Sequence, residues 1–563
     1  MKSSELGASN TVVLSLSLER SDPRPECIEL ASSCQSLCTG TTTSVSYLHF
    51  ADNKFCSYRT LGASVVQARQ GCALPRPNYA TTNSKGSIRA MSTSDSKQAI
   101  SSYDELYDFG VHHVTHGLGR ITAGIMTKGD GSYVEYADGR RMLDFTCGIG
   151  VTNLGHAHHR VSSAAAEQCM KLVHSQCSIA LHEPYLRLIE RLLPIMPHPS
   201  LDSFFFWNSG SEAVEAALKM ARVLTGRQNI ICMQGAYHGR TFGAMAVTKS
   251  KTIYSEGFHP LMPGVFSIPY PFWHQAGLPH DTPSHDLSTH ALTQLDLVLA
   301  QQTAPQDTAA IIIEPVLGEG GYVPAPAEFL QGLRQICDKH GILLIIDEVQ
   351  SGFGRTGTYF AIEESGVRPD ILLMAKGLGN GFPISAVGGT YAGNAVSCAA
   401  AVAVADAIRE ERVLENVQAR SKELFSALNG LLYDPTIRPH ILDIRGRGLM
   451  VGVEFDSPHG SGTGAQFATD NFPTTETINT LIAGSSPFKN RNGKAKDGNE
   501  IASTPKGMAS RVAKRCIEKG MLILTTSVFE VIRFIPPLNV SKEDLAKGCQ
   551  IFGEAVREVI REG

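Results

Sequence analysis

Short apolar runs alternate with segments of helical periodicity from about Tyr133 onward. The apolar runs predict strands at residues 203–207, 229–233, 309–314, 342–347 and 371–374. Between them, residues 212–224 and 326–340 have helical spacing. The first of these helices carries one predicted apolar stripe, made of Ala213, Ala217, Met220, Ala221 and Leu224. A strand–helix–strand rhythm of this kind favours an α/β fold with a largely parallel sheet.

The pattern changes after Asn394 and predicts a second domain. An Ala-rich helix leads to a helix rich in charged residues, then to an apparent strand from Arg445 to Phe455 and a final helix capped by Ser541. We expect a segment belonging with this small domain at 101–160, a large domain at 161–395 and the small domain at 396–563. Residues 456–510 are rich in Gly, Ser, Pro and Asn and predict a flexible insertion.

The first hundred residues carry no sustained helical or strand period and predict a disordered leader or an artefactual extension. Glu5 and Glu19 make the targeting signal of a mitochondrial transit peptide weak, and Met91 opens the stretch before the first well-patterned segment. The two interpretations stay open. We expect a cytoplasmic protein, with a mitochondrial location as the alternative.

Composition narrows the class of partner. The chain has 563 residues, of which 42% are hydrophobic and 18% charged, and its net charge is −4. Such a balance offers no basic field for nucleic acid or an anionic membrane, and no run of 18 apolar residues predicts a membrane span. Small-molecule partners are therefore expected. Gly155-His-Ala-His-His159 invites a zinc interpretation, but no further ligand follows at a suitable spacing, so no metal site is expected.

Two charged side chains follow predicted buried strands. Asp347 ends the run Ile342-Leu-Leu-Ile-Ile, and Lys376 follows Ile371-Leu-Leu-Met-Ala. Each residue alone also has an ordinary structural explanation. The aspartate can cap a helix or form an ion pair, and the lysine can lie at the surface. Together they are the two protein groups that a pyridoxal phosphate site needs, a Schiff-base amine and a carboxylate for the pyridinium nitrogen.

Other motifs supply the remaining parts of such a site. Gly210 and Ser211 open a predicted helix after a strand, where free backbone N–H groups can hold a phosphate. The stretch Ala236-Tyr-His-Gly-Arg-Thr241 offers an aromatic ring at Tyr237, with His238 beside it, and a carboxylate-binding guanidinium at Arg240.

In this order and spacing, the motifs resemble those of class-III pyridoxal-phosphate aminotransferases, in particular those acting on 4-aminobutyrate. The resemblance covers roughly residues 117–560. It rests on Gly148-Ile-Gly-Val-Thr-Asn-Leu-Gly-His156, Ser209-Gly-Ser-Glu-Ala213, Ala236-Tyr-His-Gly-Arg-Thr241, Ile313-Glu-Pro-Val-Leu-Gly-Glu-Gly-Gly321, Asp347-Glu-Val-Gln350, Ala375-Lys-Gly377, Gly389-Thr-Tyr-Ala-Gly-Asn394 and Val531-Ile-Arg-Phe534. It implies a fold-type-I aminotransferase, with a mostly parallel large domain, a smaller α+β domain and a homodimer.

The same resemblance implies a role for each matching residue. Lys376 and Asp347 would be catalytic. Pyridoxal phosphate would be held by Gly210, Ser211, Tyr237, His238, Asp347, Gln350 and Lys376, and by Thr390, which would reach the phosphate in the neighbouring subunit. Arg240 would bind the distal carboxylate of an ω-amino acid and Arg533 the α-carboxylate of glutamate or 2-oxoglutarate. Glu319 would cover Arg533 when the donor has no α-carboxylate.

The implied reaction moves the ω-amino group of a 4-aminobutyrate-like donor to 2-oxoglutarate. Transamination of ornithine, acetylornithine or β-alanine, or a lyase or decarboxylase reaction, is the alternative within the family. One departure favours a third reading. Family members carry a further strand and loop before the Gly-Thr-Tyr motif, whereas this chain runs directly through Ser385-Ala-Val-Gly-Gly-Thr390. An inactive pseudoenzyme is therefore also a candidate.

Overall fold

The computed structural model describes residues 100, 102–115, 118–387, 393–456 and 507–563. These residues belong to one compact unit, Ser96–Gly563. The predicted leader and nearly all of the predicted insertion, together with Thr390, lie outside the described residues. No helix in the described ranges is long and apolar enough to cross a membrane.

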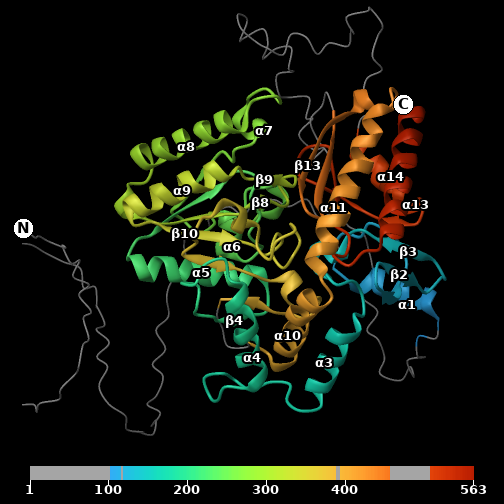
Figure 1. Cartoon of the computed structure of the whole chain (residues 1–563), viewed down its shortest axis with the longest axis horizontal. Helices are drawn as coiled ribbons and strands as arrows, with labels where there is room; N and C mark the ends of the chain where they lie inside the picture. Colours follow the sequence, from blue (N-terminus) through green and yellow to red (C-terminus); the bar gives the residue numbers. More distant parts are fainter. Residues whose placement is uncertain (1–99, 101, 116–117, 388–392, 457–506) are drawn as a thin grey trace, which may run out of the picture. The chain divides into compact units, whose positions relative to one another are not determined.

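A five-stranded parallel sheet forms the centre of the larger half (Figure 1). Its order is β11-β10-β7-β5-β6, made of Ile371–Leu373, Leu343–Asp347, Thr308–Ile313, Asn229–Met233 and Val265–Ile268. Beside β11, the short strand β12 (Ser385–Ala386) runs antiparallel to β4 (Phe206–Trp207), and an isolated bridge joins Met374 to Ala386. The fold is therefore α/β with a mostly parallel sheet, as the alternating pattern predicted.

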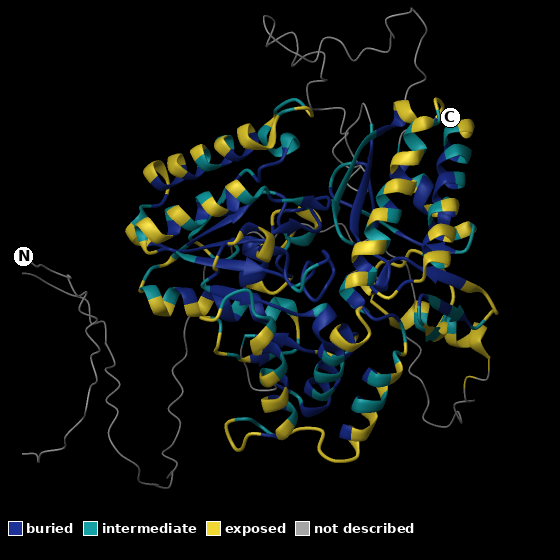
Figure 2. Cartoon of the chain, viewed as in Figure 1, coloured by how far each residue is buried: buried dark blue, intermediate teal, exposed yellow. Residues whose placement is uncertain are grey.

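Helices cover both faces of this sheet because its strands are apolar on both sides. Ile230 and Cys232 pack with α5 (Gly210–Thr225) and α6 (Phe242–Val247), whereas Ile231 and Met233 pack with α8 (Ser284–Gln301) and α9 (Ala327–His340). Alternate side chains of one strand thus enter two different layers. In Figure 2 the strands are dark blue, and yellow marks the outer sides of α8 and α9.

The smaller half contains an antiparallel sheet of order β13-β14-β17-β16, made of Ile441–Arg447, Met450–Phe455, Val531–Phe534 and Leu524–Thr526. Helices α11 (Val413–Gly430), α13 (Met508–Glu518) and α14 (Lys542–Glu562) pack beside it (Figure 1). A second sheet pairs N-terminal strands β1 (Met126–Asp130), β2 (Tyr133–Tyr136) and β3 (Arg141–Asp144) with β15 (Met521–Leu522).

The remaining elements connect these layers. Helix α10 (Ala395–Glu410) packs against α3 (His159–Cys169) and α4 (Glu183–Leu192). Helix α1 (Tyr103–His113) has no buried residue. The shorter elements are α2 (Cys147–Gly150), α7 (Trp273–Ala276), β8 (Val316–Leu317) and β9 (Val323–Pro324).

Several sequence-based boundaries were wrong. The predicted strand 203–207 is regular only at β4, and the single strand predicted from Arg445 is a hairpin of β13 and β14. Its turn uses Gly448 at φ 57°, where an added Cβ would lie 2.5 Å from the Thr356 carbonyl carbon. The predicted insertion ends too late, because α13 begins at Met508.

The predicted apolar stripe of α5 was also partly wrong. Met220 and Leu224 are exposed, whereas Val214, Ala216 and Leu218 are buried beside Ala213, Ala217 and Ala221. The helix faces the sheet along a band of mostly small residues, because small side chains allow close packing against the strands.

Candidate active site

A cavity of about 310 Å³ lies at the carboxyl ends of the parallel strands. Tyr237, Glu314, Asp347 and Lys376 stand at or shortly after the ends of β5, β7, β10 and β11. Ligands of open α/β sheets bind at this edge. The lining also includes Val151, Asn208, Ser209, Gly210, Ser211, His238, Gly239, Glu319, Val349, Gln350, Ala375, Gly381, Phe382, Pro383 and Ile384.

Two hydrogen bonds hold the Asp347 carboxylate at this edge of the sheet. Its Oδ2 lies 2.7 Å from His238 Nδ1, and its Oδ1 accepts from the Val349 backbone N–H at 3.0 Å. Only 5% of Asp347 is exposed. Among the described residues, His238 Nε2 and the nearby Gln350 Oε1 are buried without a hydrogen-bond partner. Both atoms belong to residues lining the cavity, so polar capacity remains for a ligand.

Lys376 enters the cavity from the turn after β11. Its backbone lies in the left-handed region at φ 46°, a conformation that costs a non-glycine residue free energy and marks functional turns. Burial lowers the pKa of Lys376, against the opposing effects of Glu319 and Asp347. A neutral amine is therefore easier to reach here than on the surface, and a neutral amine is the nucleophilic form.

The start of α5 forms a cradle with free backbone N–H groups. Ser209 caps the helix by accepting from the Glu212 N–H at 3.3 Å, which leaves Gly210 and Ser211 in the first turn facing the cavity. A Cβ on Gly210 would lie 2.9 Å from Val349 Cγ1, so a larger residue at the helix start would displace Val349, which follows β10. A helix terminus of this kind binds phosphate.

We call Gly210, His238, Asp347, Gln350 and Lys376 the sheet-edge cluster. All five line one cavity, as their positions in the sequence predicted.

A second cluster surrounds the pair of Glu319 and Arg533. Glu319 Oε1 lies 2.5 Å from Arg533 Nη1, and Arg533 is 4% exposed on β17. Burial opposes both charges. Arg533 and Lys251 nevertheless lower the pKa of Glu319 to about 2, and Glu319 raises the pKa of Arg533. The ion pair is thus strongly maintained at neutral pH. Because Arg533 does not line the cavity, Glu319 stands between it and the open space.

Arg240 belongs to the same cluster from the other side. Its Nε donates to Tyr237 Oη at 3.3 Å, and its guanidinium carbon lies 4.9 Å from the ring centre of Tyr254. Tyr254 Oη in turn donates to Glu319 Oε2 at 3.2 Å. Arg240 is exposed and is not part of the cavity lining, but its hydrogen-bond partner Tyr237 is. We call Arg240, Lys251, Tyr254, Glu319 and Arg533 the two-arginine cluster.

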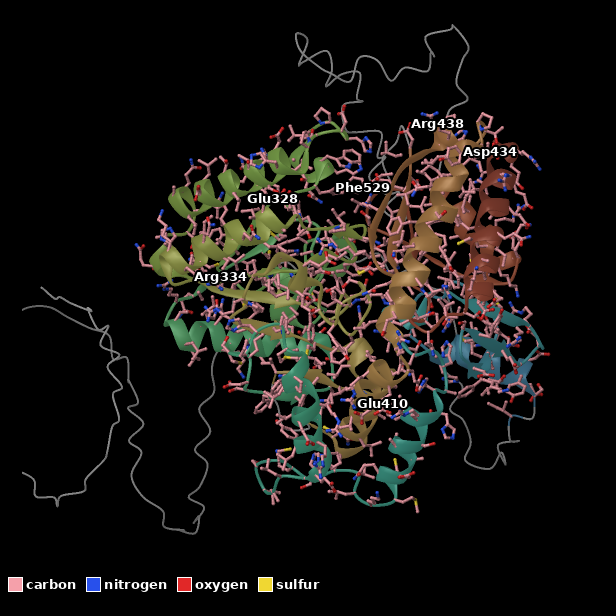
Figure 3. The ribbon with its side chains drawn as sticks, viewed as in Figure 1. Glu328, Arg334, Glu410, Asp434, Arg438 and Phe529 are labelled. Carbon is pink, nitrogen blue, oxygen red and sulfur yellow. The ribbon has the colours of Figure 1, made fainter. Side chains whose placement is uncertain are left out.

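The loop carrying Glu319 is fastened from the antiparallel sheet. Ser527 N–H donates to the Glu319 carbonyl at 2.9 Å, and Arg445 Nε donates to the Gly321 carbonyl at 2.9 Å. Phe529, labelled in Figure 3, stacks on His274 with ring centres 3.7 Å apart, next to the buried contact of His274 with Glu454. The two halves of the described chain are therefore in contact at the loop that carries Glu319.

Some residues of this site were missed by the sequence analysis. Glu314 accepts from the Tyr237 and Gly318 N–H groups at 2.9 and 3.0 Å, and burial raises its pKa to about 7. An acidic residue directly after the apolar strand β7 was the available signal. Val349 was visible only as part of a motif, and no sequence signal placed Lys251 or Tyr254 beside Glu319.

The histidine-rich stretch has a structural explanation. His156 Nε2 lies 2.8 Å from Asp144, and His158 Nε2 lies 3.1 Å from Glu411. The two rings thus interact with separate carboxylates.

Fold and site together define a pyridoxal-phosphate aminotransferase of fold type I. Residues 117–556 match the family described as aminotransferase class-III, and the chain belongs to that family. It is 34% identical to the 5-aminovalerate aminotransferase DavT of Pseudomonas aeruginosa, over 79% of this chain and 96% of the relative. It is 33% identical to the 4-aminobutyrate aminotransferase GabT of Escherichia coli, over 82% and 99%.

Other relatives carry different substrate names. An acetylornithine aminotransferase of Gloeobacter violaceus is 33% identical over 78% of this chain and 94% of the relative. The solved ornithine aminotransferase of Toxoplasma gondii, described with partial occupancy of pyridoxal phosphate at its active site, has a TM-score of 0.64 at 25% identity. That match covers 82% of this chain and 95% of the solved one.

Class-III aminotransferases use pyridoxal phosphate, and the described residues fit that group. The cavity offers an amine at Lys376, a buried carboxylate at Asp347, a helix start bounded by a glycine that no larger residue can replace without displacing Val349, and the unpartnered Gln350 Oε1. These are the donor and acceptor types that an aldehyde, a pyridinium nitrogen, a phosphate and a ring hydroxyl require.

Proposed function

We propose that this protein transfers the amino group of a 4-aminobutyrate-like ω-amino acid to 2-oxoglutarate. The observation that carries the proposal is the two-arginine cluster, because it supplies two carboxylate-binding guanidinium groups of different availability. Arg240 contacts Tyr237 and Tyr254 but forms no ion pair with a carboxylate of the described residues, so it would bind the distal carboxylate of every substrate. Arg533 is covered by Glu319 until a second carboxylate arrives.

Pyridoxal phosphate, when bound, supplies the electron sink that stabilises negative charge on the amine-bearing carbon. The chain's own residues would do the rest. Gly210 and Ser211 would hold the phosphate, Tyr237 and Val349 would flank the ring, and Gln350 would contact the ring hydroxyl. Asp347, held by His238, would keep a positive charge on the ring nitrogen.

Lys376 would have two duties. Its amine would bind the cofactor aldehyde between turnovers, and it would carry the proton from the amine-bearing carbon of the substrate. The lowered pKa of Lys376 supports both, since each needs the unprotonated amine.

The names 5-aminovalerate, 4-aminobutyrate and acetylornithine support an ω-amino donor without selecting one, whereas 2-aminoadipate is an α-amino acid. DavT and GabT are named for 5-aminovalerate and 4-aminobutyrate, and the other relatives for acetylornithine and 2-aminoadipate. The test is a donor screen on purified protein with 2-oxoglutarate as acceptor and glutamate as the measured product. Activity with 4-aminobutyrate or 5-aminovalerate above that with acetylornithine supports the proposal, and the reverse order contradicts it.

We also propose a homodimer. Helix α1 has no buried residue and exposes Tyr103, Leu106 and Phe109, an apolar surface suited to a second copy. Sedimentation at micromolar concentration should give twice the chain mass. A monomer there contradicts this part of the proposal.

A pseudoenzyme is the second candidate, favoured by the direct run Ser385-Ala-Val-Gly-Gly-Thr390. In the family, the strand and loop absent here separate Lys376 from the threonine proposed to reach the other subunit's phosphate. A residue spans at most about 3.6 Å, so the shorter chain restricts that threonine. Under this second candidate, the unmodified chain retains the cofactor weakly and turns over slowly, and inserting the family's strand and loop between Val387 and Gly388 increases both. Full cofactor occupancy and ordinary turnover in the unmodified chain would eliminate this candidate.

A further inference from the structure

Arg533, Tyr254 and Lys251 contact the carboxylate of Glu319, and they divide between its two oxygens. Oε1 faces Arg533 at 2.5 Å. Oε2 faces Tyr254 Oη at 3.2 Å and Lys251 Nζ at 4.0 Å. The carboxylate thus already touches a second group of partners on the side away from Arg533.

A second group of partners is needed if Arg533 is to bind a substrate carboxylate. Once that carboxylate takes Arg533, Glu319 remains as a buried charge whose original partner is occupied, and an unpaired buried charge is costly. It would also repel the incoming carboxylate. Affinity for a dicarboxylate therefore depends on where Glu319 goes.

Tyr254 and Lys251 are suited to hold the Glu319 carboxylate after it leaves Arg533. Lys251 is 14% exposed at its side chain, and Tyr254 packs edge to face on Tyr237 with ring centres 5.0 Å apart. Both residues come from the segment after α6, whereas Arg533 lies on β17 of the other sheet. Glu319 can exchange partners without movement of its own backbone, which Ser527 and Arg445 fasten.

We propose that Tyr254 and Lys251 are positioning residues that hold Glu319 when a substrate carboxylate occupies Arg533, and thereby set the preference for a dicarboxylic second substrate. The proposal rests on the proposed function, since it concerns the acceptor half of that reaction. Tyr254 has a further effect through Arg240, whose guanidinium lies over its ring. A substitution that keeps the ring separates the two effects.

The test is calorimetric binding to the full chain loaded with pyridoxal phosphate. Glutarate, with two carboxylates and the carbon chain length of 2-oxoglutarate, engages Arg240 and Arg533. Pentanoate, with one carboxylate, leaves Glu319 on Arg533. We expect Tyr254→Phe to raise the Kd of glutarate about tenfold, the effect of one hydrogen bond to a charged group, and that of pentanoate by less than about twofold. Lys251→Gln should change the two affinities in the same pattern.

A double-mutant cycle tests the route through Glu319. In the Glu319→Gln background, Tyr254→Phe should change glutarate affinity by less than about twofold, because the charge that Tyr254 holds is gone. In kinetics, Tyr254→Phe should raise the KM for 2-oxoglutarate and leave kcat for the donor half-reaction unchanged.

Three results would overturn the inference. These are equal weakening of glutarate and pentanoate, an undiminished Tyr254→Phe effect in the Glu319→Gln background, and wild-type protein that binds glutarate no more tightly than pentanoate. The proposed function fails separately. Protein that shows the glutarate pattern but transfers no amino group from ω-amino acids would refute the reaction and leave the role of Tyr254 and Lys251 intact.

Discussion

The sheet-edge cluster and the two-arginine cluster lie side by side but are built in different ways. His238, Asp347 and Lys376 stand at or after the carboxyl ends of strands β5, β10 and β11 of one parallel sheet, so the fold of the larger half places them by itself. Glu319 and Arg533 are 214 residues apart and come from both halves of the described chain. Charge pairing joins them.

The difference separates a fixed part of the site from an adjustable one. Asp347 is buried and has hydrogen bonds to a ring and to a backbone N–H, and Gly210 leaves no space for a methyl group. Glu319 has partners on both oxygens and can give up one of them. A single cofactor needs the first arrangement, and two substrates of unequal charge need the second.

The largest effect should come from removing Lys376. Lys376→Ala should abolish the absorption of lysine-bound cofactor and lower turnover by at least about 10⁴-fold, because nucleophile and proton carrier are lost together. Spectra and steady-state rates measure both. Lys339→Ala, on the exposed side of α9, is the control and should change neither. Near-normal turnover of Lys376→Ala would mean that the sheet-edge cluster is not the reactive centre.

Arg240→Ala should come next. Loss of the charge-assisted hydrogen bonds to the distal carboxylate should lower kcat/KM for ω-amino acids by an amount equivalent to roughly 1.5–3 kcal/mol, with a smaller effect on simple amines that lack this carboxylate. The comparison uses 4-aminobutyrate and butylamine as donors. If both lose the same amount, Arg240 supports the fold instead of selecting substrates.

Strong acid should weaken the ion pair between Glu319 and Arg533. The pKa of Glu319 is about 2 in the folded protein and about 4.3 in the unfolded chain. Ionised Glu319 therefore stabilises the folded protein fully at pH values above about 4.3. This stabilisation disappears as the pH falls toward 2. The contribution is roughly 3 kcal/mol at neutral pH. The free energies of unfolding of wild type and Glu319→Gln should differ at pH 7, and the difference should shrink below about pH 4.3 and disappear near pH 2. A constant difference would argue against this pKa.

The smallest effect concerns a single methyl group. Gly210→Ala places a Cβ 2.9 Å from Val349 Cγ1, and overpacking of this kind costs roughly 1–3 kcal/mol. We expect cofactor affinity to fall by about tenfold or more. Gly430→Ala is the matched control, since a Cβ on that helical glycine meets nothing within 4 Å. Unchanged cofactor affinity in Gly210→Ala would show that the start of α5 is not a close-fitting cradle.

The sequence predicted the parallel sheet and the sheet-edge cluster well because each of their signals is local. An apolar run followed at once by Asp347 or by Ala375-Lys376 marks the end of a buried strand, and strand ends of one parallel sheet meet at one edge. The hairpin at Gly448 and the buried face of α5 were not predicted correctly. Turn geometry and packing partners decide them, and neither has a unique pattern in sequence.

The sequence by itself therefore determined the succession of strands and helices along the chain, the family, and the residue types available for catalysis and binding. Only the tertiary structure showed that Glu319 pairs with Arg533 and that Tyr254 and Lys251 contact the same carboxylate. It also showed that Glu314 accepts a hydrogen bond from the Tyr237 N–H. The physical reason is distance along the chain. The position of a residue that follows a strand is set by that strand. The ion pair of Glu319 and Arg533, 214 residues apart in the chain, forms only after the two sheets have packed together.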